Sequence, residues 1–539
     1  MASYDKDNTK VKQEETTKEN QKPVPCCCSQ RWILAYLSFF GFFCLFALRT
    51  NISVAIVCMV NTKNLTHGIL FNGSYDNTTT PHPCITEESS SSLSEHEGFD
   101  WNKTLMSSIL ASFFYGYTVT QIPGGWLADK FGGKKVLGIG LLISAISTII
   151  LPVCARPVLH PGVCFESYHR FGTAVLSMWG RWAPPLESTK LTSFIQLGAV
   201  FGMFGTLSSG GVLCHYGFDH GWGSIFILTG GLTVIWVLVW FLTTSDSPAT
   251  HRFITEVEKQ YILSSIGHIH VHDKKTKIPW KSIATSMPFV ACLTAHFCYN
   301  WTNYTLMTSL PIFMKEALHL DVKQNGLLSS FPFLTQVISA FIAGHGADSL
   351  RYRKILSNTA IRKLFQISSA GVFLVVCGYL NCQQKYIIVV CLCMSTFCLG
   401  FSVAGFLCNH VDIAPRYAGV LFGITNTIAT IPGMLAPIVA GALTHNHDQQ
   451  CPTLLAGQNV NACNIVVHVR KASMQTAEEW RSVFFVCLGF NLLGIIVYGA
   501  FASGEVQTWG TNLNIEIEVK KGEKQTLENG IAMIGNLQS

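Results

Sequence analysis

A single arginine interrupts the first long apolar run of this chain. The run covers about residues 32–60, and Arg49 is its only charged side chain. An arginine inside a membrane-spanning helix costs roughly 2.5 to 3.5 kcal/mol on insertion scales, so such a residue usually faces a polar cavity and has a function there. The chemistry that fits is the binding of an anion or the control of a gate. The alternative is an arginine near the non-cytosolic end, whose charged group reaches the membrane surface.

Other titratable side chains inside apolar runs could bind protons. Histidine has an ordinary pKa of about 6.5, between the pH of an acidic lumen and that of the cytosol, so His296 is a candidate. Its alternative is a structural histidine that is hydrogen-bonded within a helix bundle. Glu166 and Arg170 stand four residues apart and could pair on one face of a short span at about 163–179.

The sequence lacks the combinations of residues that are typical of an enzyme. No nucleophile lies in a pattern with a general base, and no cluster of residues has the spacing of a metal site. We therefore expect no catalytic residues, no metal and no cofactor. The net charge of +6 is spread over short loops, which indicates membrane topology and argues against a nucleic-acid partner.

These side chains have to be positioned by membrane-spanning helices. Of the 539 residues, 49% are hydrophobic and only 13% are charged, against about 25% charged in ordinary soluble domains. Apolar runs long enough to cross about 30 Å of hydrocarbon recur along the chain. A window of about 19 residues finds about twelve of them. We therefore expect an all-α polytopic membrane protein, six helices in each half, in contact with the lipid bilayer.

Loops and tails predict how these spans are oriented. Residues 61–103 form a hydrophilic stretch, here called the sequon loop. Its four glycosylation sequons begin at Asn64, Asn72, Asn77 and Asn102. Several sequons in one loop predict a glycosylated luminal or extracellular face. Lysine and arginine collect on the opposite side, which predicts that both termini are cytosolic.

The apolar runs and the polar segments predict the domain organisation. The second half crosses the membrane at about 286–314, 326–346, 362–380, 386–408, 417–443 and 481–502. The predicted parts are a disordered tail 1–30, an N-terminal half 31–245, a central cytosolic loop 246–285, a C-terminal half 286–503 and a cytosolic tail 504–539.

A charged turn joins the apolar runs at about 105–127 and 136–153. It reads Gly-Trp-Leu-Ala-Asp-Lys-Phe-Gly-Gly-Lys-Lys at 125–135, and a degraded copy stands at 344–354. The pair resembles the loop signature of the major facilitator superfamily, whose two halves are parallel repeats. The resemblance implies a gating or scaffold role for Gly125, Asp129, Gly133, Lys134, Asp348 and Arg351.

Longer motifs narrow the resemblance. The run from Asn409 to Met434 is similar to the signature of the anion:cation symporter family, as are the stretches at 47–54, 182–187, 296–301 and 502–509. The chain is identified as a sialin-like member of that family. The resemblance implies a secondary active carrier of small organic anions, such as sialic acid, other acidic sugars or acidic amino acids. The expected coupling ion is H⁺, with Na⁺ as the alternative, and the expected membrane is lysosomal, vesicular or plasma membrane.

The resemblance also assigns substrate-binding residues. Arg49 matches the first-helix arginine that engages a substrate carboxylate, which agrees with the cost of placing it there. The second helix contributes an aromatic wall that matches Tyr115 and Tyr117. Cavity positions on the seventh helix match His296, Tyr299, Asn300 and Tyr304. The signature residues Asn409 and Asp412 are expected to cap or gate the cytosolic end of the tenth helix.

The fourth span departs from the family pattern. It is shorter, lacks the family's glycine motif and has Leu176 where a histidine is expected, so the coupling role is not carried onto Glu166 or Arg170. Two alternatives therefore stay open beside the proton symporter. One is a sodium-dependent phosphate or organic-anion cotransporter of the same family. The other is a non-transporting regulatory isoform with a defective fourth helix.

Cysteines are frequent but are not spaced like a disulfide scaffold. Most of the 20 lie inside apolar runs, for example Cys44, Cys58, Cys292, Cys391 and Cys393. There we expect them to behave as small hydrophobic residues. In the loop before the last span, Cys451 and Cys463 could form a disulfide.

Overall fold

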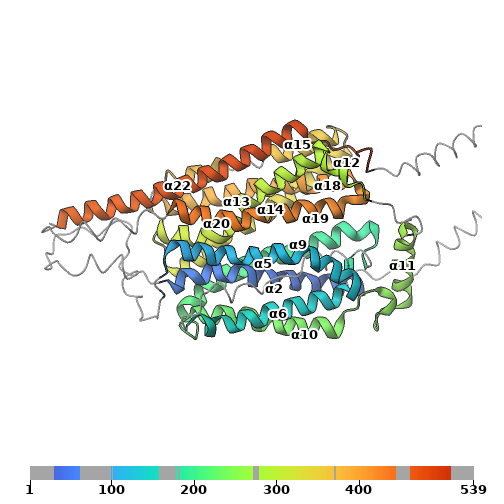
Figure 1. Ribbon diagram of the computed structural model, residues 1–539, viewed down its shortest axis with the longest axis horizontal. Coiled ribbons are helices and arrows are strands. Elements are labelled where there is room, and N and C mark those ends of the chain that lie inside the picture. The colour runs from blue at the N-terminus through green and yellow to red at the C-terminus, as the bar shows by residue number, and fades with distance from the viewer. Residues whose placement is uncertain are drawn as a thin grey trace, which may run out of the picture. The chain divides into compact units, whose positions relative to one another are not determined.

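The computed structural model is all-helical, as predicted (Figure 1). It describes residues 29–60, 99, 101–156, 178–179, 182–270, 278–368, 372–380, 382–444 and 462–510. The α-helices are α2 (Gln30–Met59), α5 (Lys103–Phe131), α6 (Gly133–Ala155), α9 (Pro185–Tyr216), α10 (Trp222–Thr243), α11 (Glu256–His270), α12 (Trp280–Ala284), α13 (Met287–Glu316), α14 (Val322–Tyr352), α15 (Asn358–Ile367), α16 (Val372–Cys377), α17 (Lys385–Gly400), α18 (Phe406–Ile413), α19 (Ala418–Ile428), α20 (Ile431–Leu443) and α22 (Ala462–Phe501).

Within the described residues, nine helical segments are long and apolar enough to cross a membrane. They include the whole of α2, α6 and α10, and they join α15 with α16, α17 with α18, and α19 with α20. Helix α13 has 30 residues but is not one of the nine, because polar side chains occupy its middle. Polar residues at membrane depth usually face the bundle interior or a water-filled cavity. The composition of α13 is therefore that of a helix that lines such a cavity.

The chain divides into two compact units. Unit 1 contains Met1–Asn51, Val119–Thr206 and Ile225–Thr276. Unit 2 contains Ile52–Thr118, Leu207–Ser224 and Lys277–Ser539. Helices α2, α5 and α9 each contribute to both units. The boundaries of the two six-helix halves remain predictions.

Indole groups on α10 connect the helices of unit 1. Trp236 Nε1 donates a hydrogen bond to the carbonyl oxygen of Leu37 in α2 at 2.9 Å, and Trp240 Nε1 donates to that of Lys134 in α6 at 3.1 Å. The two indoles stack with their ring centroids 5.0 Å apart. Tryptophan buries a large apolar surface and still needs a partner for its N–H. These two side chains therefore hold α10 against both neighbours.

Glycine permits close contact between helix backbones in both units. In unit 1, a Cβ atom added to Gly198 of α9 would collide with the carbonyl oxygen of Phe39 in α2. In unit 2, Gly211 of α9 faces Gly326 of α14, where an added Cβ would lie 3.0 Å from the facing Cα. Small residues at such crossings are the usual way in which membrane helices pack, because lipid offers no hydrophobic driving force between them.

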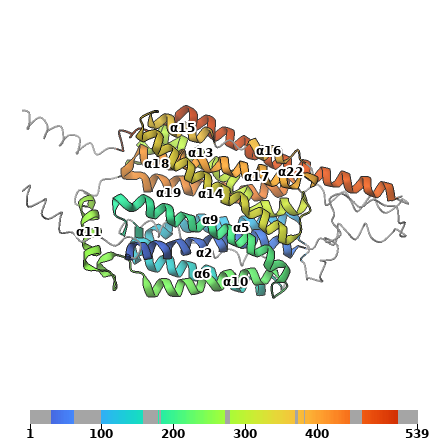
Figure 2. The same ribbon diagram turned by 180° about the vertical axis from the view of Figure 1, so that it is seen from behind.

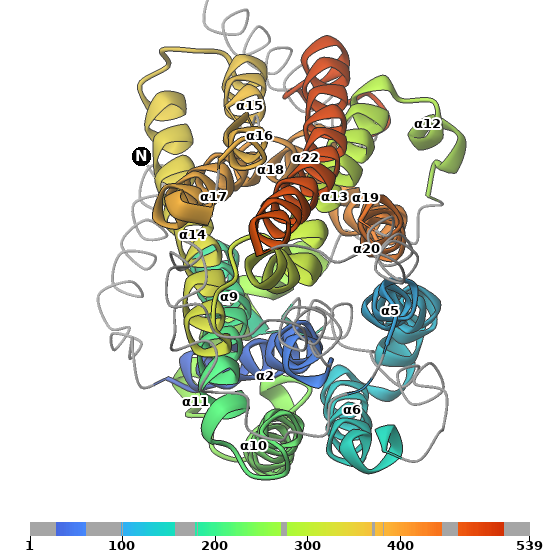
Figure 3. The same ribbon diagram turned by 90° about the vertical axis from the view of Figure 1, so that its left-hand side faces the viewer.

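Helix α13 occupies the centre of unit 2. It packs against α22, α20, α14, α18 and α19, and Figure 3, which looks along the helices, shows it between α22 and the α19–α20 pair. On the other side of the unit, α14 packs along α17 (Figure 2). The core around the first half of α13 contains Phe289, Cys292, Phe406 and Tyr498. Every element of unit 2 that carries a predicted site residue therefore contacts α13 or belongs to it.

The prediction for Cys58 was wrong. Cys58, at the end of α2, forms a disulfide with Cys214, at the end of α9, across 156 residues of sequence. Both cysteines lie in unit 2. The sequence places Cys58 inside an apolar run, and only the meeting of the two helix ends shows that it has a partner. Cys451 lies outside the described residues, as do Glu166, Arg170 and Leu176 of the fourth span, so those predictions stay as they were.

Two further differences concern polar segments. The central loop contains two helices, α11 and α12, that the hydropathy pattern did not predict. The last helix, α22, begins at Ala462, well before the expected start at about 481. A search for apolar runs finds only the part of a helix that lies in the membrane, so polar helical extensions escape it.

Candidate functional site

Arg49 lies in α2 of unit 1 and is buried, with 8% of its surface exposed. Its guanidinium group lies over the ring of Phe46, 5.4 Å from the centroid. The next two residues are buried and polar as well, and Asn51 Nδ2 donates to Thr229 Oγ1 of α10 at 3.4 Å. A polar turn inside an apolar helix costs free energy on membrane insertion, so its presence indicates a function.

The two tyrosines of α5 lie on different faces of that helix. Two positions along an α-helix correspond to a rotation of about 200°. Tyr117 is half-buried, and its hydroxyl accepts a hydrogen bond from Asn426 Nδ2 of α19 at 3.2 Å. Tyr115 is 46% exposed. The structure therefore joins Tyr117, but not Tyr115, to the polar residues of α19.

Asn300 and Tyr304 are buried on one face of α13, four residues apart. Asn300 Nδ2 donates to the carbonyl oxygen of Ala429 at 2.8 Å and to the hydroxyl of Tyr304 at 3.4 Å. Ala429 lies between the end of α19 and the start of α20. The ring of Tyr304 lies 4.7 Å from that of Phe114 in α5. A carbonyl group at a helix break needs a hydrogen-bonding partner at membrane depth, and Asn300 supplies that partner.

His296 is buried within the helix bundle and has hydrogen-bonding partners there. Its Nδ1 lies 3.1 Å from Thr425 Oγ1, and Nε2 of His410 lies 2.9 Å from the same hydroxyl. Aromatic rings of Phe406 and Phe422 cover the imidazole at 5.0 and 5.7 Å. His296 is 4% exposed. This is the geometry of the structural alternative, in which one threonine hydroxyl bridges two imidazoles.

Tyr299 lies on another face of α13 and has two amide neighbours that the sequence interpretation missed. Gln336 Nε2 of α14 donates to the Tyr299 hydroxyl at 2.9 Å and to Asn303 Oδ1 at 3.3 Å. All three side chains are partly exposed. The signal that could have found Asn303 and Gln336 is their position, because each is an amide near the middle of a predicted span.

The first copy of the loop motif is ordered by backbone contacts in unit 1. Lys134 donates its backbone N–H to Asp246 Oδ1 at 2.7 Å, and its Nζ donates to the carbonyl oxygens of Phe241 and Thr244 at 2.8 and 2.7 Å. These carbonyls lie at the end of α10, where a cation is favourable. Gly133 is the first residue of α6. The surroundings of Gly125 and of the Asp129 side chain lie outside the described part of the chain.

Beside the second copy of the motif, an arginine and a carboxylate form an ion pair. Arg362 Nε of α15 lies 2.6 Å from Asp412 Oδ2, and Arg351 NH1 lies 3.9 Å from Asp412 Oδ1. Arg362 and Asp412 each keep only 9% of their side chains exposed. Asp348 is exposed, and Asn409 Nδ2 donates to Cys292 Sγ at 3.4 Å. Of the predicted residues, Asp412 therefore forms a buried ion pair with Arg362, while the exposed Arg351 lies at the edge of that pair.

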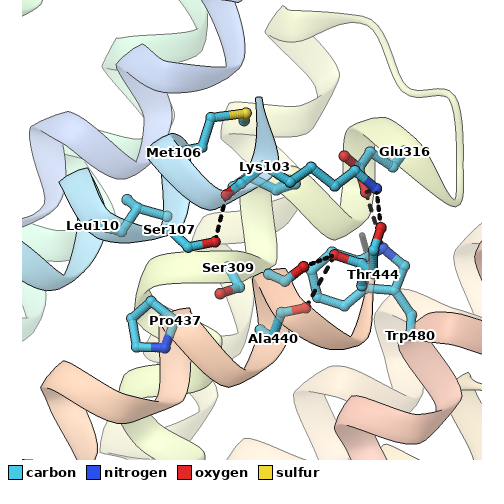
Figure 4. A pocket seen from close by; sticks show the side chains of 12 residues that line it. Lys103, Met106, Ser107, Leu110, Ser309, Glu316, Pro437, Ala440, Thr444 and Trp480 are labelled. Carbon is cyan, nitrogen blue, oxygen red and sulfur yellow. Dashed lines mark hydrogen bonds and ion pairs between the residues drawn. The ribbon is translucent and has the colours of Figure 1, made fainter. Parts of the chain in front are cut away.

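Another charged contact lies at the end of unit 2 that borders the sequon loop, here called the sequon-side end. Lys103 Nζ of α5 lies 3.4 Å from Glu316 Oε2 of α13 and donates to the carbonyl oxygen of Thr444 at 2.8 Å (Figure 4). Trp480 Nε1 of α22 donates to the same carboxylate oxygen at 3.2 Å. Lys315 Nζ donates to the Val57 carbonyl at 2.6 Å. These bonds tie α2 and α5 to the helices around α13.

A small cavity lies beside the ion pair at the sequon-side end. Its volume is about 20 Å³, and Met106, Ser107, Leu110 and Ser309 are among the residues that line it (Figure 4). A space of this size holds a water molecule but not an organic anion. It is therefore a packing gap at the contact and not a substrate site.

Asn102, the sequon asparagine that the structure describes, has a structural role. Asn102 Oδ1 accepts a hydrogen bond from the backbone N–H of Leu105 at 2.8 Å, which makes Asn102 the N-terminal cap of α5. Asn64, Asn72 and Asn77 lie outside the described residues. Glycosylation of the four asparagines remains a prediction.

Comparisons with known proteins agree with the motifs. The Major Facilitator Superfamily model matches residues 38–437. Human sialin is 38% identical over 502 residues, which cover 91% of this chain and 92% of sialin. Vesicular glutamate transporter 1 of Xenopus tropicalis is 32% identical over 505 residues, 91% of this chain and 78% of that protein.

Solved structures show the same fold at low identity. A bacterial homologue of the human lysosomal transporter Spinster aligns with a TM-score of 0.60 and 12% identity, over 88% of this chain and 97% of that one. A D-xylose–proton symporter aligns with a TM-score of 0.58 and 12% identity, over 88% and 99%. The chain therefore belongs to the major facilitator superfamily and, within it, to the anion:cation symporter family, as a multi-pass membrane transporter and not an enzyme.

Proposed function

We propose that the chain carries small organic anions with one carboxylate, such as sialic acid and other acidic sugars, by proton-coupled symport. The observation that carries the proposal is the buried Arg49 in the middle of α2. A guanidinium group is always charged and matches a carboxylate with two parallel hydrogen bonds. A carboxylate ligand would bring the opposite charge to this buried group, which gives its position an electrostatic reason.

The polar side chains of unit 2 favour one carboxylate over two. Apart from the exposed Tyr115 and the buried His296, the residues that the resemblance assigned to the cavity there, and their hydrogen-bonding neighbours, are uncharged amides and tyrosines. They are Tyr117, Tyr299, Asn300, Asn303, Tyr304, Gln336 and Asn426. Such groups bind hydroxyl and amide substituents of a ligand and carry no positive charge of their own. Acidic amino acids are therefore weaker candidate substrates than acidic sugars.

Alternating access also requires contacts that open and close. The sequon-side contacts made by Lys103 and Lys315 join helices of both repeats, so a substrate can enter from that side only after these contacts break. We propose that they form the gate on the luminal or extracellular side of the membrane, which is lysosomal, vesicular or plasma membrane, with both termini in the cytosol. One unit of pH gradient supplies about 1.4 kcal/mol per proton, enough for roughly tenfold accumulation.

The test is uptake of labelled sialic acid into proteoliposomes with an imposed pH gradient. Arg49→Ala should lower the uptake by roughly 10- to 100-fold, because a charged hydrogen-bonding partner is lost. Arg49→Lys is the matched control and should keep more of the uptake, since it retains the charge but not the planar fork.

Three outcomes would contradict the proposal. Uptake that requires Na⁺ in place of a pH gradient would support the sodium-dependent cotransporter. Folded wild-type protein with no flux of any anion would support the non-transporting isoform. Equal uptake by the wild type and Arg49→Ala would remove Arg49 from the substrate site.

A further inference from the structure

A cluster of three uncharged side chains joins α13 to α14 near the middle of both helices. Gln336 of α14 bonds both the Tyr299 hydroxyl and Asn303 Oδ1, at 2.9 and 3.3 Å. Tyr299 and Asn303 are four residues apart and so lie on one face of α13. We call Tyr299, Asn303 and Gln336 the amide cluster.

The amide cluster faces away from the exposed apolar surface of α14. That surface contains Phe331, Ile338 and Phe341. Gln336 is two positions from Ile338, a rotation of about 200° around the helix. The three members are nevertheless partly exposed. Polar groups that are exposed at membrane depth, but not on the apolar surface, are expected to line a water-filled path.

The bonds within the cluster leave hydrogen-bonding capacity unused. Among the described residues, Gln336 Nε2 uses both of its hydrogens, while Gln336 Oε1 and Asn303 Nδ2 have no partner. If both amides are turned over, Gln336 Nε2 and Asn303 Oδ1 are left instead. Either arrangement offers a donor and an acceptor together. This combination fits a hydroxyl or amide group of a ligand, and it carries no positive charge that would bind a carboxylate.

We propose that the amide cluster is a subsite that binds hydroxyl or acylamide groups of the transported anion. This inference rests on the proposed anion transport. The subsite would give the carrier its preference for hydroxylated over plain carboxylates. A site that is built to hydrogen-bond a hydroxyl discriminates strongly against an analogue that lacks it, because its own polar groups then lose their partners.

The experiment measures binding of three six-carbon probes to purified full-length protein. Gluconate has a carboxylate and hydroxyls, hexanoate has only the carboxylate, and sorbitol has only hydroxyls. Each probe is tested as a competitor of labelled sialic acid and, by thermal shift, as a direct ligand. The wild type should prefer gluconate over hexanoate by tenfold or more.

Two substitutions of Gln336 separate a ligand subsite from a bond that only joins helices. Gln336→Leu should lower the ratio of the gluconate affinity to the hexanoate affinity about tenfold, and it should weaken sorbitol binding by a similar factor. Gln336→Glu has nearly the same size and can still accept a hydrogen bond from Tyr299, but it brings a negative charge. It should weaken the binding of the anion gluconate by tenfold or more and the binding of the uncharged sorbitol much less.

Thr335→Val is the matched control. Thr335 is the neighbouring residue, but its hydroxyl bonds the Cys393 carbonyl and Thr396 of α17, at 3.0 Å each. The substitution removes an interhelical bond of similar strength outside the cluster. It should leave the ratio between the probes unchanged.

The outcomes distinguish the subsite from the proposed function. If the ratio of gluconate to hexanoate affinity is unchanged in both Gln336 variants, the subsite proposal is wrong while the proposal of anion binding stands. If sorbitol binds in a Gln336-dependent way and no carboxylate binds, the subsite stands and the anion proposal fails. If none of the probes binds to folded wild-type protein, both are overturned.

Discussion

The two copies of the loop motif turn the chain at different places. Aligned on their aspartates, α5 ends at Phe131, two residues after Asp129, while α14 ends at Tyr352, four residues after Asp348. In the first copy, Gly132 has a φ of 93° and starts the turn at once. The second copy has Arg351 and Tyr352 where the glycine pair would stand, so the helix continues and the turn falls at Lys354, which has a φ of 53°. The glycine pair therefore decides where the helix ends.

The two copies also differ in how they stabilise charge. Lys134 of the first copy bonds carbonyl groups at the end of α10, and Asp246 accepts a backbone N–H. Near the second copy, Arg362 and Asp412 form a buried ion pair. Substitution of a lysine that bonds carbonyl groups leaves no charged partner behind. Substitution of one residue of a buried ion pair leaves the other residue's charge buried and uncompensated. Loss of one partner of the ion pair beside the second copy should therefore cost more stability than loss of the Lys134 side chain in the first copy.

The largest effect is expected from Asp412→Ala. It leaves Arg362 buried without its carboxylate and should lower the free energy of unfolding by about 3 to 5 kcal/mol. Thermal unfolding of the purified protein in detergent measures it. Asp348→Ala, which replaces an exposed aspartate of the second copy, is the control and should change little. Equal losses in both variants would contradict the buried ion pair.

Gly132→Ala should have an intermediate effect. The φ of 93° is strained for alanine, and the new Cβ would lie 2.5 Å from Asp246 Oδ2. Together these should cost about 1 to 3 kcal/mol. The same unfolding measurement applies, with Gly231→Ala as control, because a Cβ there meets nothing within 4 Å. Gly231 lies in α10, so that control should gain about 0.5 to 1 kcal/mol. A gain in stability for both variants would show that the turn does not need its glycine.

The smallest effect, and a favourable one, is expected from Lys354→Gly. Lysine at a φ of 53° costs about 1 to 2 kcal/mol, and glycine removes that cost but loses about 0.5 to 1 kcal/mol in backbone entropy. The net gain should be about 0.5 kcal/mol in thermal unfolding. Arg353→Gly is the control, since Arg353 has a φ of −75° and gains nothing from glycine. A loss in Lys354→Gly would mean that the lysine side chain stabilises the turn.

Much of the fold was predictable from local sequence. Apolar runs predicted α2, α6 and the helices of the second half, because each spanning helix satisfies its own backbone hydrogen bonds and needs only length and apolarity. Helices α11 and α12 escaped because they are polar. Of the predicted site residues, Arg49 followed from the cost of a charge in an apolar run. Tyr117 and Tyr299 came from the resemblance. Their partner Gln336 lies outside the quoted motifs, and Asn426 lies within the signature at 409–434 but was given no role there.

By itself, the sequence determined the helical membrane class, the loop motif, the family and the buried arginine. Each of these depends on residues that are close together in the chain. Only the tertiary structure decided that Cys58 pairs with Cys214, that His296 shares a hydroxyl with His410, and that Gln336 reaches Tyr299. These contacts join residues on different helices. Local hydropathy and spacing carry no record of which helix faces hydrogen-bond one another, because side-chain packing between helices sets those contacts.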